Sequence, residues 1–112
     1  MLIRIVHMYF TKDGIEKFLE IFNENADAIR QMEGCTHLEL LRDIDDTGHF
    51  TTLSTWTRIE QLDQYRASPL FRQVWGRVKM LFARKPVAYS MRQEWNGRYS
   101  RPFVHPNSSG EN

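Results

Sequence analysis

Residues 2–10 read LIRIVHMYF, a short segment with apolar side chains on both faces of an extended chain. Because side chains alternate along a strand, one face carries Ile3, Ile5, His7 and Tyr9. The other face carries Arg4, Val6, Met8 and Phe10. Apolar groups on both faces predict a strand that is covered on both sides.

The next segments along the chain predict a helix and two strands. Asp13 and Glu16 have the spacing of a capping box, in which two side chains satisfy free backbone N–H groups at a helix start. Apolar residues then recur at helical spacing, and Gly34 suits the left-handed conformation that often ends a helix. Residues 35–42 and the Thr-rich residues 50–56 predict the two strands.

A second helical region follows the third strand. Thr57 and Glu60 repeat the capping-box spacing and mark its start. Ser68-Pro69 divides it, because serine can cap a new helix and proline is tolerated at the first helical position. Pro86 is expected to stop the second part, and residues 87–95 predict the fourth strand.

The order of elements is therefore β-α-β-β-α-β. It predicts an α+β, ferredoxin-like domain, with an antiparallel four-stranded sheet and the helices on one face. We expect the other face to be apolar, drawing on Val6, Met8, Phe10 and Leu53. A large apolar surface exposed to water usually marks an interaction site, so the sequence predicts a homodimer formed through the sheet faces.

Composition limits the class of protein. The 112 residues are 41% hydrophobic and 26% charged, an ordinary mix for one domain. The net charge of +1 provides no positive field for nucleic acid or an anionic membrane, and no apolar run approaches the ~20 residues of a membrane span. The single Cys35 and the lack of a secretory start favour the cytoplasm. We expect a domain at 1–95 and a C-terminal tail at 96–112, flexible or docked on the partner.

A recurrent pattern runs through the middle of the chain. Trp56 closes the third strand, and the run Tyr65-Arg66-x-Ser68-x-Leu70-Phe71 and then Trp75 follow it. Together with Gly34-Cys35-Thr36-His37-Leu38-Glu39-Leu40, this pattern resembles the antibiotic biosynthesis monooxygenase (ABM) superfamily over about residues 2–91. The resemblance implies a dimeric α+β barrel with a pocket in each monomer, between the sheet and the helices. Its enzymes include cofactor-independent monooxygenases of polyketide-like phenols, quinol monooxygenases and haem-degrading enzymes.

The haem-degrading branch fits this sequence poorly. That branch has an Asn on the first strand and an iron-binding His on the last helix. His7 and Trp75 stand at the corresponding positions here, and an indole nitrogen cannot ligate iron. Haem degradation is therefore disfavoured, with His7 left as the one alternative ligand.

Six residues are candidates for the site. We expect catalytic roles for His7, Trp56 and Tyr65: His7 as a base for a phenol, Trp56 as a stacking surface, and Tyr65 as a polar aromatic wall. We expect Arg66, Phe71 and Trp75 to bind substrate, with Arg66 steadying an anion. Each has a plainer alternative. His7 fits a hydrogen-bonded buried histidine, the aromatic residues fit core packing, and Arg66 fits a surface ion pair with Asp63 or Glu60.

No metal site or cofactor is predicted. The four histidines have no ligand spacing, and Cys35 follows a helix end that disfavours a thiolate, so we expect it to be buried and inert. Two functions stay open. One is a cofactor-independent monooxygenase that oxidises a small aromatic or quinol-type substrate with O2. The other is a non-enzymatic dimer that binds a small ligand or is purely structural.

Overall fold

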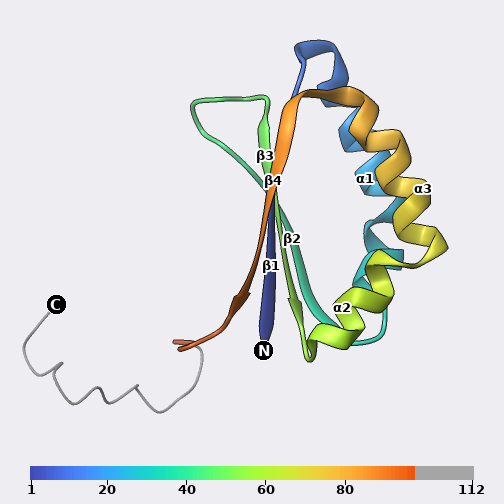
Figure 1. The fold of residues 1–112 in the computed structure, drawn as a ribbon. Coiled ribbons are helices and arrows are strands. Elements are labelled where there is room, and N and C mark those ends of the chain that lie inside the picture. The colour runs from blue at the N-terminus through green and yellow to red at the C-terminus, as the bar shows by residue number, and fades with distance from the viewer. Residues whose placement is uncertain (98–112) are drawn as a thin grey trace, which may run out of the picture.

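The computed structural model describes residues 1–97 (Figure 1). The strands are β1 (Leu2–Phe10), β2 (Cys35–Arg42), β3 (His49–Trp56) and β4 (Phe82–Arg92). The helices are α1 (Ile15–Arg30), α2 (Ile59–Arg66) and α3 (Pro69–Val78), with short 3-10 helices at Lys12–Gly14 and Lys79–Leu81. The predicted tail at 96–112 lies almost wholly outside the described residues.

The predicted fold class is confirmed. The four strands form one antiparallel sheet in the order β2-β3-β1-β4, and Figure 1 shows all three helices on the same side of it. The described helices include none with the length and apolar character needed to cross a membrane. The dimer stays a prediction.

The two faces of the sheet are assigned differently from the prediction. Met8 lies opposite Phe50 in the β1–β3 pair, and both are buried against the helices with Phe10, Phe18, Ile21 and Val78. The Arg4-Val6-Met8-Phe10 face of β1 is therefore the helix-covered one. Of the residues expected on the open face, only Leu53 lies there, opposite Ile5.

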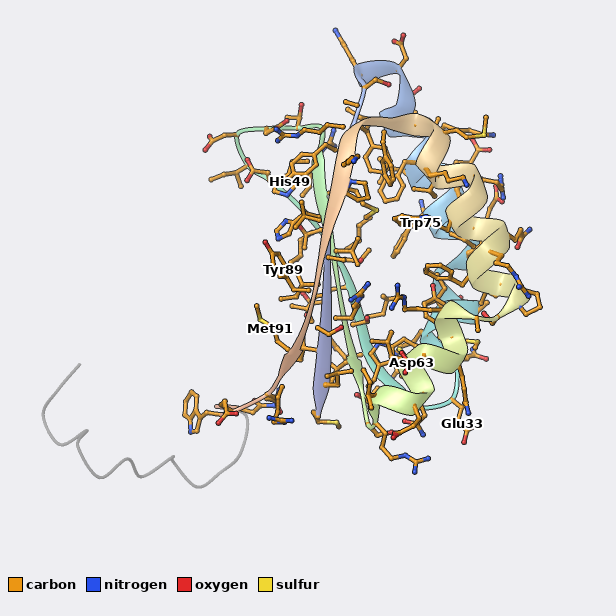
Figure 2. The ribbon with its side chains drawn as sticks, viewed as in Figure 1. Glu33, His49, Asp63, Trp75, Tyr89 and Met91 are labelled. Carbon is orange, nitrogen blue, oxygen red and sulfur yellow. The ribbon has the colours of Figure 1, made fainter. Side chains whose placement is uncertain are left out.

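The open face is nevertheless apolar. Four of its residues are large, hydrophobic and at least 40% exposed: Leu41, Val87, Tyr89 and Met91. Figure 2 shows Tyr89 and Met91 on the side of the sheet away from the helices. A covering partner would therefore pack on a different set of residues from the one predicted.

Two of the predicted helix starts are wrong. The first α-helix has no side-chain cap from Asp13, because the chain forms a 3-10 turn at Lys12–Gly14 before α1 begins. In α2 the cap lies one residue later than predicted, where the Arg58 backbone N–H donates to Gln61 Oε1 at 3.1 Å. The third helix start is confirmed: Ser68 Oγ accepts a hydrogen bond from the Phe71 backbone N–H at 3.2 Å.

The prediction that Pro86 stops a helix is also wrong. The helix ends at Val78, and β4 begins at Phe82, so Pro86 lies inside the strand. Proline has no N–H to give to a sheet and is tolerated at edges and irregularities. β4 is an edge strand, and its register with β1 shifts between His7 and Tyr9, next to the position of Pro86.

Gly34 joins α1 to β2 and holds α2 in place. It has φ +87°, in the left-handed region, and a Cβ there would collide with the side chain of Gln61, the residue that caps α2. Both the backbone conformation and the close approach require glycine.

We expect Gly34→Ala to destabilise the protein by about 1–3 kcal/mol, through backbone strain and displacement of Gln61. Urea denaturation measures this change. Gly76→Ala is the matched control, because a Cβ at Gly76 meets nothing within 4 Å and the position is helical. It should be neutral or slightly stabilising. Equal effects of the two substitutions would contradict the role given to Gly34.

Candidate functional site

A cavity of about 340 Å³ lies between the sheet and the helices. Its walls are mostly apolar, with Val6 and Met8 from β1 on one side and residues of α2 and α3 on the other. Figure 2 shows Trp75 projecting from α3 toward the sheet. Such a cavity, apolar with a few convergent polar groups, is the usual form of a small-molecule site.

Three aromatic rings form one wall of this cavity. Tyr65 meets Phe71 edge to face, with ring centroids 5.2 Å apart and an interplanar angle of 84°. Phe71 is nearly parallel to Trp75, at 5.8 Å and 10°. The break between α2 and α3 at Ser68 brings these rings together, since Ser68 Oγ also donates to the Tyr65 backbone carbonyl at 2.6 Å. The aromatic wall is therefore made of residues that the sequence had singled out.

Trp56 lies behind this wall and does not line the cavity. It is 0% exposed, its indole Nε1 donates to Ser54 Oγ at 2.9 Å, and its ring stacks on Tyr65 with centroids 5.3 Å apart. It therefore packs in the core, the plainer of its two predicted roles. Its contact with Tyr65 makes it a residue that positions the aromatic wall.

The Tyr65 hydroxyl is a proton donor at neutral pH. Burial, with a smaller effect of the nearby Cys35 thiol, raises the pKa of Tyr65 to about 12. Within residues 1–97 its hydroxyl forms no hydrogen bond, and the residue lines the cavity. It is free to donate a hydrogen bond to an oxygen atom of a bound molecule.

Two arginines reach the same cavity. Arg66 of α2 is exposed and lines it, and Arg4 of β1 lines it from the sheet. Burial lowers the pKa of Arg4, and the positive charge of Arg66 lowers it further. The predicted ion pair of Arg66 with Asp63 or Glu60 is not found among the described residues. Arg4 was not predicted as a site residue, although a charge beside Val6, Met8 and Phe10 on one strand face was a usable signal.

The expectation that His7 shares the pocket with Trp56 and Tyr65 is wrong. Because alternate residues of β1 face opposite ways, the burial of Met8 against the helices turns His7 to the open face. There His7 Nδ1 is 2.9 Å from His49 Nε2 and 3.0 Å from Thr51 Oγ1. No sequence pattern indicates this histidine pair, since it depends on the β1–β3 register.

The remaining polar candidates offer no metal site. Within residues 1–97 no group of three or more His, Cys, Asp or Glu residues is arranged to hold a metal ion. Cys35 is buried, as predicted, and burial raises the pKa of its thiol, against a smaller opposing effect of its hydrogen bond to the His37 carbonyl. A raised pKa disfavours the reactive thiolate.

Comparison with known families agrees with this architecture. The family model described as antibiotic biosynthesis monooxygenase matches residues 1–75. The chain belongs to the antibiotic biosynthesis monooxygenase (ABM) family. The resemblance predicted from the Trp56 and Tyr65–Trp75 pattern is therefore confirmed. No curated protein is significantly similar to this ABM chain in sequence.

Solved structures share the fold. An antibiotic biosynthesis monooxygenase structure aligns with a TM-score of 0.78 at 22% identity, covering 83% of this chain and 98% of that one. A conserved protein from Methanosarcina mazei aligns at 0.79 and 17%, covering 84% and 94%. Rv0793 from Mycobacterium tuberculosis aligns at 0.79 and 17%, covering 86% and 97%. At these identities the likeness establishes the ABM fold alone.

The position of Tyr65 predicts a pH effect on stability. Its pKa is about 12 in the folded protein and about 10 when unfolded. The folded state therefore favours the protonated phenol, so the stability it contributes is complete below pH 10 and is lost as the pH rises toward 12. A difference of about two pKa units corresponds to at most about 3 kcal/mol.

Denaturation of the wild type and of Tyr65→Phe between pH 8 and pH 12 measures this effect. Over that range the unfolding free energy of the wild type should fall relative to that of Tyr65→Phe, because only the wild type has an ionisable hydroxyl at position 65. Parallel pH profiles would mean that Tyr65 ionises like an exposed tyrosine.

Proposed function

We propose that this protein is a monooxygenase that oxidises a small aromatic of the phenol or quinol type with O2 in the sheet–helix cavity. The observation that carries the proposal is the composition of that cavity, which combines an aromatic wall with a protonated Tyr65 hydroxyl and the Arg66 guanidinium. A flat ring fits against Phe71 and Trp75, and its oxygen can receive the hydrogen bond from Tyr65. Family membership supports the reaction class.

The chemistry requires an electron-rich anion. A phenolate or hydroquinone anion can pass electrons to O2 without a cofactor. With a hydroquinone, one oxygen atom is added to the ring to give a hydroxyquinone, while the other leaves as water with the two hydrogens that the substrate loses. The substrate supplies all the electrons, so the proposal requires no cofactor.

The cavity favours that anion electrostatically. Its lining contains no Asp, Glu or His, so no described side chain there is an ordinary base. The positive charge of Arg66 and the Tyr65 hydrogen bond instead lower the free energy of the substrate anion, so that the neutral substrate can give its proton to water. Trp56 acts through Tyr65, holding its ring in position.

The same absence of a base favours the second candidate function, a module that binds a small aromatic ligand without changing it. The two functions share the cavity and differ in turnover. A ligand that binds tightly while O2 is not consumed would support this second function.

Oxygen uptake with a panel of hydroquinones and phenols tests the enzyme. We expect one O2 consumed per quinone formed, with one labelled oxygen atom in the product when labelled O2 is used. Uncatalysed oxidation instead releases hydrogen peroxide. Tyr65→Phe should lower kcat by about 100-fold, as expected for the loss of a hydrogen-bond donor to a reacting oxygen.

Tyr89→Phe makes the same chemical change on the open face of the sheet and should leave kcat unchanged. Activity that survives Tyr65→Phe would remove Tyr65 from the mechanism. A panel that gives no uptake above the uncatalysed rate would contradict the enzyme proposal for these substrates.

We also propose that the open sheet face pairs with a second copy of the chain. Leu41, Val87, Tyr89 and Met91 supply exposed apolar surface there, and a twofold pairing would bring equivalent patches together. Because the net charge of each chain is only +1, two copies repel each other little. Each subunit keeps its own cavity on the opposite side of the sheet. The cytoplasm remains the proposed compartment, in keeping with the free, buried Cys35.

Light scattering after size exclusion tests the pairing. We expect a dimer at micromolar concentration, and Met91→Glu should weaken it by placing a charge in the apolar interface. Met80→Glu is the control, because Met80 is 81% exposed on the 3-10 helix after α3, away from this face. A wild-type monomer, or equal weakening by both substitutions, would contradict pairing through the open face.

A further inference from the structure

Two guanidinium groups from different elements converge on the cavity. Arg4 comes from the central strand β1 and Arg66 from the end of α2, and both line the cavity. They are close enough for the charge of Arg66 to disfavour the charged form of Arg4. Like charges beside an apolar cavity raise the energy of the empty site.

Among the described residues, no acidic side chain forms an ion pair with either arginine. The ion pairs within residues 1–97 involve Lys17, His37, His49 and Arg77, and neither Arg4 nor Arg66 has a carboxylate oxygen within 4.0 Å. Arg4 Nη1 donates one hydrogen bond, to Ser90 Oγ at 2.9 Å. A guanidinium has five N–H donors, so most of those on Arg4 remain available to a ligand.

The surroundings of the pair restrict the ligand further. Phe71 and Trp75 present nearly parallel rings on the same cavity, which suits a flat aromatic group. The cavity volume of about 340 Å³ is at the lower end for small-molecule sites, so the ligand is small. A planar carboxylate matches the fork geometry of arginine better than any neutral oxygen does.

We propose that the substrate is an aromatic acid whose carboxylate lies against Arg4 and Arg66 while its ring lies along Phe71 and Trp75. This inference rests on the proposed function only in taking the cavity as the substrate site. It adds a permanent negative charge to the substrate, separate from the phenol oxygen that reacts. Arg4 thereby becomes a specificity-determining residue.

Binding of a matched pair of ligands tests the proposal without turnover. The probes are 2,5-dihydroxybenzoate and its methyl ester, which share the hydroquinone ring and differ in charge. Calorimetry under nitrogen prevents oxidation. We expect the acid to bind at least 10-fold more tightly than the ester, the size of effect typical of a charged hydrogen-bonded contact.

Substitutions of the arginines test which residues recognise the carboxylate of the acid. Arg4→Met and Arg66→Met should each weaken binding of the acid by about 10-fold or more and leave the ester nearly unchanged. Arg72→Met is the matched control, since Arg72 is exposed on α3 and does not line the cavity. It should leave both affinities unchanged. If Arg4→Met does not fold, Arg4→Lys replaces it and should retain part of the preference, because it keeps the charge and loses the fork.

Equal affinities for acid and ester, or equal effects of Arg4→Met and Arg72→Met, would overturn the inference. This failure is distinguishable from failure of the proposed function. Preferential binding of the acid without oxygen uptake would support the anion site and remove the monooxygenase. Oxygen uptake that is equally fast with acid and ester, and that is unchanged by substitution of Arg4, would support the monooxygenase and remove the anion site.

Discussion

The alternation of side chains along β1 governs the whole molecule. β1 is a central strand, hydrogen-bonded to β3 on one side and to β4 on the other. Once Met8 and Phe10 pack against α1 and Phe50, every other β1 residue is committed to one of two environments. Arg4 is thereby placed in the cavity layer and His7 on the open face. A register slip of one residue would exchange these environments.

Local signals in the sequence were sufficient for the order of elements. The Ser68-Pro69 pair predicted the start of α3 correctly because a cap depends on residues three positions apart. The aromatic residues after Trp56 could likewise be predicted as site residues, because their spacing along the chain is a local pattern. The family resemblance rested on the same short pattern, and the family model over residues 1–75 confirms it.

Contacts between residues far apart in the sequence decide which face of β1 meets the helices. Both faces of β1 are apolar, so hydrophobic alternation gave no reason to choose which one meets the helices. The choice follows from Phe18 and Phe50, which are distant in sequence and packed together in the core. For the same reason His7 was assigned to the wrong layer, while its contact with His49 was missed. Pro86 was misplaced because its tolerance depends on β4 being an edge strand.

The edge strand β4 also limits how copies of this chain can assemble. Arg84, Lys85 and Pro86 follow one another along it, the first two exposed and the third without an N–H. Consecutive cations and a missing donor discourage an incoming strand from extending the sheet. This edge is therefore guarded against open-ended, fibril-like growth. The twofold pairing proposed for the open face differs from such growth, because it closes on itself and stops at two copies.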